Sequence, residues 1–307
     1  MNYLSHSPGP PLARWVDHLW SLTDAPSHTR ESILPSGTLE LVINLHENEL
    51  RIYDPSSVHS PRRLSGAIVS GAYRAPFVID TREHASIMGV HFKPGGAFPL
   101  LGALPGELGN LHLDLETLWS GLATELRERL CEETTPEHRF RRLERTLVAR
   151  LHCARECHRA VPVALEKLSE SRATVAEIAA CVGLSHRRLI EVFTAEVGMT
   201  PKLFARVQRF QRTLATARRS ASADWAGLAL THGYSDQSHL IRDFVAFSGF
   251  SPETLLRHRD DPVKENHVAL TEGGGSNSSN TPERLSAISS AKGRHHDRNS
   301  PSDRHAS

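Results

Sequence analysis

The sequence predicts an α+β chain with a β-rich N-terminal domain, a helical connector, an all-α C-terminal domain with two helix-turn-helix units, and a disordered tail. Three observations support this prediction. Residues 12–100 contain short segments rich in β-branched residues, separated by Gly, Pro and Ser. From about residue 114 onward, apolar residues recur at spacings of three and four. Finally, residues 178–193 and 228–244 carry the same residue pattern.

Four short segments predict the strands of the N-terminal domain, which we place at residues 1–110. Residues 39–45 read LELVINL, and residues 64–73, 77–80 and 86–92 are similarly apolar. The turn-forming sequence KPGGAF then ends the region. Short strands at this spacing are typical of a β-sandwich or β-barrel.

The rest of the chain divides into three parts. Residues 111–160 predict a helical connector, because stretches such as PEHRFRRLERTLVARL have the helical period of apolar residues. Residues 161–260 are again helical, in shorter pieces broken by Gly. Residues 261–307 have few apolar residues and much Gly, Ser and charge, so we expect a disordered tail.

Composition excludes several classes of protein. The 307 residues hold 36 Lys and Arg against 35 Asp and Glu, so the net charge of +1 favours no partner by itself. The four cysteines lie in helix-like stretches, which is not a disulfide framework and fits a reducing compartment. The chain has no signal-peptide core and no run of eighteen apolar residues. We therefore expect a cytoplasmic protein without a membrane partner.

The repeat in the C-terminal domain predicts two copies of a helix, a tight turn and a second helix. Gly183 and Ser185 match Gly233 and Ser235 at an offset of 50. The following Leu and Phe match at an offset of 51, so the second copy has one inserted residue. Glycine ends a helix at low cost in the left-handed conformation, and serine is a preferred N-cap. We expect Ser185 and Ser235 to cap the second helix of each unit.

The outward face of each second helix is polar. In the second unit Ser238 and Arg242 lie opposite the apolar stripe, and His239 and Gln237 lie beside them. In the first unit Arg187 and Glu191 take the outward positions, next to Arg188. Such side chains can form hydrogen bonds with base edges in the major groove of DNA.

Basic residues are concentrated in the same region. Residues 201–219 contain six basic residues and no acidic residue. Residues 172–259 hold twelve Lys or Arg and seven Asp or Glu, a local net charge of +5. We expect phosphate contacts from this region, with Arg206 and Arg209 among the candidates.

These motifs resemble the DNA-binding domain of the AraC/XylS family of bacterial transcriptional regulators. The matching residues include Gly183-Leu184-Ser185 in the first unit and the run Gly233–His239 in the second. The resemblance covers residues 161–259 and implies two recognition helices in successive major grooves of double-stranded DNA. It implies base contacts from Arg187, Ile190, Glu191, Gln237, Ser238, His239 and Arg242, and phosphate or cap roles for Ser185, Arg188, Arg206, Arg209 and Ser235.

One residue departs from the family pattern. Glu191 stands where many members have a basic residue. Glutamate can accept a hydrogen bond from cytosine, but it can also pair with Arg187 four residues earlier. If that pair forms, the recognition helix of the first unit orients the protein on DNA more than it recognises bases.

The N-terminal half resembles the poorly characterised sensor-like domain that precedes a subset of these regulators. The matching pieces are LPSGTLELVINL, GVHFKPGGAFPLLG and LDLETLWSG. This resemblance implies a β-rich, cupin-like domain without naming a ligand. We expect a small-molecule effector at this domain, and a second copy of the chain and RNA polymerase as further candidate partners. No catalysis, cofactor or metal is expected.

Other interpretations compete with this one. In the simplest alternative, the polar faces of the two second helices contact water and bind no DNA. An enzyme of the cupin type would use His84 and His91 as metal ligands, but seven residues along one strand place them on opposite faces. His91 and Lys93 instead suit a ligand pocket. The segment LHCARECH, residues 151–158, lacks metal-ligand spacing and favours cysteines that face a core. In a third interpretation, the β domain serves only dimerisation.

Overall fold

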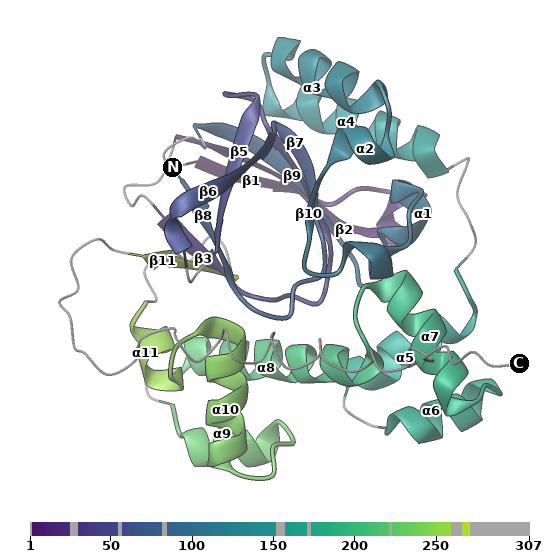
Figure 1. The fold of residues 1–307 in the computed structure, drawn as a ribbon, viewed down its shortest axis with the longest axis vertical. Coiled ribbons are helices and arrows are strands. Elements are labelled where there is room, and N and C mark those ends of the chain that lie inside the picture. The colour runs from purple at the N-terminus through teal and green to yellow at the C-terminus, as the bar shows by residue number, and fades with distance from the viewer. Residues whose placement is uncertain are drawn as a thin grey trace, which may run out of the picture.

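The computed structural model describes residues 2–24, 30–54, 57–81, 85–151, 157–170, 173–220, 223–258 and 266–270. A β-rich N-terminal domain lies against one side of the long helix α8, Pro201–Arg219, and shorter helices gather at both ends of α8 (Figure 1). The predicted α+β architecture is confirmed.

Two antiparallel sheets form the N-terminal domain. The first has the order β1-β2-β9-β4-β7-β10, and the second has the order β11-β3-β8-β5-β6. All four predicted segments contain strands. The strands of the first sheet are β1 Asn2–His6, β2 Val16–Thr23, β4 Glu40–Asn44, β7 Ala67–Ser70, β9 Ser86–Phe92 and β10 His112–Asp114. Those of the second are β3 Arg30–Ile33, β5 Glu49–Asp54, β6 Ser57–Ser65, β8 Phe77–Asp80 and β11 His267–Leu270.

Alternation along β4 shows how the first sheet is covered on both faces. Leu41 and Ile43 are fully buried in the main core, which continues into the helices. Val42, on the opposite face, packs against the smaller apolar cluster between the two sheets. Successive strand residues point to opposite faces, so one strand contributes to both cores.

Helices cover the outer face of the first sheet. They are α1 Phe98–Leu101, the 3-10 helix η2 Pro105–Leu108, α2 Leu115–Leu118, α3 Leu122–Glu132 and α4 Pro136–Leu151, with the short 3-10 helix η1 Leu12–Arg14 near the N-terminus. Residues 112–114 pair with β7 as strand β10, where the sequence predicts the start of the helical connector. That part of the prediction is wrong. The strand could not be seen in the sequence, because three residues are too few to show a period of apolar positions.

Seven helices form the C-terminal domain among the described residues. They are α5 Ala160–Ser169, α6 Val175–Val182, α7 His186–Val197, α8, α9 Trp225–Thr231, α10 Gln237–Ser248 and α11 Pro252–Arg257. The aromatic rings of Phe210, Phe244 and Phe247 pack together where α8 meets α10.

Strand β11 is the main correction to the predicted domain plan. Residues 267–270 lie in the segment predicted to be disordered, yet they pair antiparallel with β3 of the N-terminal domain. Val268 is fully buried. The strand forms because a distant edge supplies its hydrogen bonds, which local composition cannot indicate. The remainder of the predicted tail lies outside the described residues.

The two domains are in direct contact. Gln208 and Gln211 of α8 donate hydrogen bonds to the backbone oxygens of Ser36 and Pro35, at 3.0 and 2.6 Å. At the other end of α8, η2 packs on α7 so closely that a Cβ on Gly106 would lie 2.7 Å from the backbone oxygen of Thr194.

Candidate nucleic-acid interface

The first helix-turn-helix unit consists of α6 and α7. Thr174 caps α6 in a capping box with Glu177, whose pKa is lowered by the Thr174 backbone and side-chain hydrogen bonds. Gly183 ends α6 in the left-handed conformation at φ 69°. Ser185 then caps α7 by accepting a hydrogen bond from the Arg188 backbone N–H. The predicted cap at Ser185 is confirmed.

The second unit, α9 and α10, repeats this plan with one change. Gly233 has the expected left-handed φ of 77°. The cap of α10, however, is Asp236, whose Oδ1 accepts from the His239 backbone N–H at 2.7 Å. The prediction that Ser235 is the cap is therefore wrong. The inserted residue lies before the helix and moves the cap position one residue along, which restores the offset of 51 from Ser185.

The outward face of α7 is charged and exposed. The Arg187 side chain is 90% exposed, and its Nε donates to Glu191 at 2.9 Å. Arg188 also lies 3.5 Å from Glu191. The hydrogen bond from Arg187 lowers the pKa of the Glu191 carboxyl. The predicted pair of Arg187 and Glu191 is thus present in the free protein, and Ile190 lies half-buried beside it.

The outward face of α10 carries less charge. Gln237, Ser238 and Arg242 are exposed, and Arg242 Nε donates to the Ser238 backbone oxygen at 3.2 Å. His239 is half-buried and turned inward, with Nδ1 3.2 Å from the Ser235 hydroxyl. Three of the four predicted positions on α10 are therefore exposed.

A buried carboxylate of α10 forms ion pairs with two arginines of α8. The Asp243 side chain is only 2% exposed, and it accepts from Arg206 at 2.6 Å and from Arg209 at 3.3 Å. Arg209 also stacks over the Tyr234 ring and donates to the Gly233 backbone oxygen. Both arginines thus fix the second unit on α8, and their phosphate contacts stay a prediction. Asp243 matches the family pattern in the sequence, but no role was predicted for it, although an acidic residue between Leu240 and Phe244 on the inward face of the helix indicates a buried ion pair.

The two units enclose a basic hollow of about 700 Å³. It lies between the C-terminal end of α5, the N-terminal end of α6, the N-terminal half of α8 and residues 239–243 of α10. Its lining includes the basic side chains of Lys202, Arg206, Arg209 and Arg242.

Comparison with protein families matches residues 178–258 to the family described as a helix-turn-helix domain. The match begins inside α6 and ends just after α11, so it spans both units. Residues 178–258 are an AraC-type helix-turn-helix domain. The chain is a DNA-binding transcriptional regulator. A second match assigns residues 4–114 to a domain of unknown function, DUF6597.

Solved structures provide further similarities. A transcriptional regulator of Chromobacterium violaceum with an AraC-type DNA-binding domain is 20% identical over 34% of this chain and 94% of its own, with a TM-score of 0.31. Apo ToxT from Vibrio cholerae is 9% identical over 78% of this chain and 97% of its own, with a TM-score of 0.42. ToxT bound to an unsaturated fatty acid gives 9% identity, 83% and 94% coverage, and a TM-score of 0.41. No curated protein matches the sequence.

Away from the AraC-type domain, a cavity lies between the two sheets. We call it the sandwich cavity; it comprises an opening of about 240 Å³ and an inner space of about 50 Å³ that share Trp20, Ile33, Glu40 and His267. Trp20 Nε1 donates to Glu40 at 2.6 Å, and His267 Nδ1 lies 2.5 Å from the buried Glu31 carboxylate. His267 belongs to β11, so a segment that follows the DNA-binding domain completes the cavity wall.

The two residues predicted for an N-terminal ligand pocket separate in the structure. His91 lines the opening of the sandwich cavity, stacks on His18 and has a pKa lowered by burial. Lys93 is not among the residues that line the cavity, and it donates to the Ala13 backbone oxygen at 2.7 Å.

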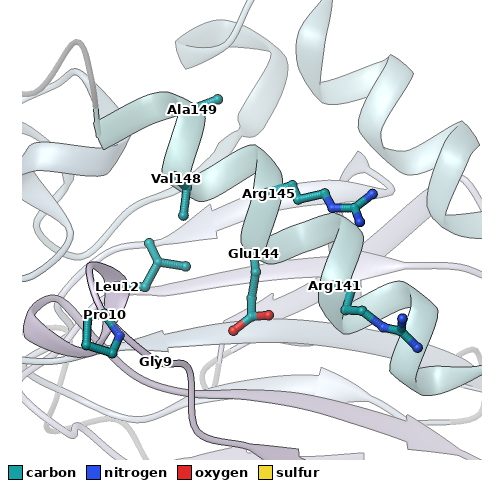
Figure 2. A pocket seen from close by; sticks show the side chains of 8 residues that line it. All are labelled: Gly9, Pro10, Leu12, Arg141, Glu144, Arg145, Val148 and Ala149. Atoms are coloured by element: carbon teal, nitrogen blue, oxygen red, sulfur yellow. The ribbon is translucent and has the colours of Figure 1, made fainter.

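A second hollow of the N-terminal domain lies on its helical side. It has a volume of about 560 Å³ and lies between the loop at Gly9 and Pro10 and helix α4 (Figure 2). The side chain of Glu144 extends from α4 toward the sheet, and Oε1 lies 3.1 Å from His6 Nε2. Nothing in the sequence had indicated this hollow.

The residues of the two alternative metal-site interpretations lie partly outside the described residues. His84, His152 and Cys153 lie outside the described residues. Within the described residues, no group of three His, Cys, Asp or Glu side chains is placed to hold a metal ion. Cys131, Cys157 and Cys181 are free thiols, and burial raises the pKa of Cys157 to about 11. None of the described helices has the length and apolar character needed to cross a bilayer.

Proposed function

We propose that this bacterial, cytoplasmic regulator binds a specific duplex through two successive major grooves, with α7 in one groove and α10 in the next. The observation that carries the proposal is the duplicated unit with its two exposed faces. Arg187 and Glu191 occupy the outward positions of α7, and Ser238 and Arg242 occupy the equivalent positions of α10. A helix of 19 residues such as α8 is roughly 28 Å long at 1.5 Å per residue. That length is of the order of one turn of B-DNA, about 34 Å.

Phosphate contacts supply most of the affinity in this proposal. The basic hollow between the two units faces the stretch of DNA backbone that separates the two grooves. Lys202 is the cation of this hollow that is left for a phosphate, because Arg206 and Arg209 already pair with Asp243 and Arg242 is proposed to contact a base. Such contacts position the protein on the duplex, and contacts with base edges select the sequence.

Control by the N-terminal domain is supported by one direct contact with the AraC-type domain and by one connection along the polypeptide. The 3-10 helix η2 packs on α7, and strand β11 joins the polypeptide beyond α11 to the wall of the sandwich cavity. A molecule bound in the cavity would therefore contact β11 as well as strands of the N-terminal domain. Its binding shifts the DNA-binding equilibrium by as much as its affinities for the two states differ.

The lining of the sandwich cavity favours a small effector with an apolar body and a hydrogen-bond-donating or cationic group. The inner space is lined by apolar side chains such as Val42, Ile68 and Phe77, with the Glu40 carboxylate at its junction with the opening. The described lining residues include neither Lys nor Arg. A carboxylate ligand would meet Glu40 without a compensating cation. A second copy of the chain and RNA polymerase remain proposed partners.

The proposed function is tested by competition between duplexes. Full-length protein is used to enrich bound duplexes from a random library, and its affinities for the enriched duplex and for random duplex are compared at one fixed salt concentration. We expect the enriched duplex to bind about 10³-fold or more tightly, the lower end of specific recognition. Equal affinity for the two would overturn the proposal.

The effector is tested separately by thermal unfolding with phenethylamine and with 3-phenylpropanoate, which share an apolar body and differ in charge. We expect the amine alone to stabilise the protein, and Glu40→Gln to remove that stabilisation. A larger stabilisation by the carboxylate would overturn the proposed effector class.

A further inference from the structure

Two apolar side chains are exposed on the outward face of α10. Ile241 is 38% exposed and Val245 is 45% exposed, and they are two of the four large hydrophobic residues that are most exposed in the described part of the chain. The cap, the inward stripe and the contact with α8 are all formed without them. Their exposure is therefore not explained by the packing of the helix.

Their positions on the helix place them among the proposed base-contacting residues. Ser238, Ile241, Arg242 and Val245 follow one another at spacings of three, one and three, so they form a continuous patch on one side of α10. The buried residues Leu240, Phe244 and Phe247 occupy the other side. A helix that inserts Ser238 and Arg242 into a major groove inserts Ile241 and Val245 as well.

We infer that Ile241 and Val245 recognise thymine by contact with its C5-methyl group, an inference that rests on the proposed function. In the major groove a thymine presents that methyl group and one acceptor, and apolar side chains are its natural partners. Burying two exposed apolar side chains against methyl groups removes apolar surface from water on both molecules. The enriched duplex therefore contains thymine at the positions that α10 contacts.

The first unit shows that this patch is particular to α10. The offset of 51 pairs Ile241 with Ile190 and Val245 with Thr194. Thr194, however, lies beneath η2 of the N-terminal domain, and its hydroxyl is buried without a hydrogen-bond partner among the described residues. Ile190 is half-buried. In α7 the charged pair of Arg187 and Glu191 thus dominates the accessible face, whereas in α10 apolar side chains share it.

The test replaces single thymines of the enriched duplex by deoxyuridine. This exchange deletes one methyl group and leaves the hydrogen-bonding groups of the base unchanged. With full-length wild-type protein, we expect the affinity to fall about threefold to fivefold at one or two positions, which corresponds to one buried methyl group. Those positions should lie in the half of the duplex whose recognition is lost in Arg242→Ala.

Side-chain variants connect the methyl groups to the two residues. We expect Ile241→Ala and Val245→Ala each to bind thymine and deoxyuridine equally well at one of the sensitive positions. The matched control is Leu230→Ala, which removes a side chain that is 73% exposed on α9 and should keep the full sensitivity. Equal thermal unfolding temperatures of the four proteins verify that they are folded.

Three results would overturn the inference. They are a duplex that tolerates deoxyuridine at every position, a double variant of Ile241 and Val245 that stays as sensitive as the wild type, and an enriched half-site without thymine. Failure to enrich any duplex is a different outcome, because it removes the proposed function itself.

Discussion

Asp243 of α10 and Arg206 of α8 form an ion pair with an Nη2 to Oδ1 distance of 2.6 Å, although the Asp243 side chain is only 2% exposed. A buried carboxylate is costly unless it is paired and hydrogen-bonded. Asp243 meets that condition through Arg206 and Arg209 together, which come from successive turns of α8. The orientation of the second recognition helix on α8 therefore depends on this carboxylate.

Replacing the carboxylate tests that dependence. We expect Asp243→Asn to lower the free energy of unfolding by about 2–3 kcal/mol, because it removes charge-assisted hydrogen bonds and leaves Arg209 partly buried without its anion. Asp17→Asn, at an exposed aspartate of the N-terminal domain, is the matched control and should change stability little. Chemical denaturation measures both. A loss for Asp243→Asn no larger than that of the control would contradict the assigned role.

Arg242 is expected to contact a base. Arg242→Ala should weaken binding to the enriched duplex by about 1–3 kcal/mol, the contribution of one good base contact. Arg129→Ala removes an equally charged, exposed side chain from α3 and serves as the control. Binding is measured by titration at constant salt. An equal loss on enriched and random duplex would assign Arg242 to a phosphate instead.

Acid should destabilise the N-terminal domain through His112. Burial lowers the pKa of this histidine from 6.5 to about 3, and its Nδ1 is in contact with the Tyr73 hydroxyl. As the pH falls below 6.5, the unfolded chain binds a proton that the folded chain refuses until about pH 3, so stability decreases. Between pH 7 and pH 5 the free energy of unfolding should fall by about 2 kcal/mol from this group, at 1.36 kcal/mol for each pKa unit.

Two glutamine variants isolate the contribution of His112. His112→Gln removes the titrating group while keeping a polar side chain beside Tyr73, and it should flatten the dependence on pH. His186→Gln changes an exposed histidine and should leave that dependence intact. Denaturation curves at pH 7 and pH 5 provide the comparison. If the free energy of unfolding depends on pH equally in the two variants, His112 does not cause the loss of stability in acid.

Strand β11 should stabilise the N-terminal domain. A chain that ends after residue 258 loses the strand, exposes the hydrogen-bonding edge of β3 and loses the buried Val268. We expect its free energy of unfolding to be lower by about 2–3 kcal/mol, the contribution of one fully buried aliphatic side chain. A chain that ends after residue 270 keeps β11 and is the control. Unfolding of both shortened chains at the same temperature would show that β11 adds nothing.

The AraC-type domain was predictable because its signals are local and occur twice. Gly183 and Gly233 end helices in both units, and the apolar stripe fixes which face of each second helix is outward. The cap of α10 was predicted at the wrong residue because Ser235 and Asp236 are adjacent and both are preferred N-caps. Sequence spacing alone could not decide whether the inserted residue lies before the start of the helix or inside it.

The links between the domains could not be predicted, because each depends on a contact between distant segments. Val268 is the one fully buried residue of β11, which lies in a polar region of the sequence, and no local pattern reveals its partner strand β3. The same applies to η2, whose proximity to Thr194 follows from tertiary packing alone. These contacts are also the ones that the proposed control by an effector uses.

The most direct test of two-groove recognition compares the duplexes enriched by the wild-type protein, by Arg187→Ala and by Arg242→Ala. We predict two blocks of selected bases in the wild-type site, with centres about one helical turn, or 10–10.5 base pairs, apart. Each variant should lose selection in its own block and keep the other. A single block that both variants lose together would contradict recognition by two separate helices.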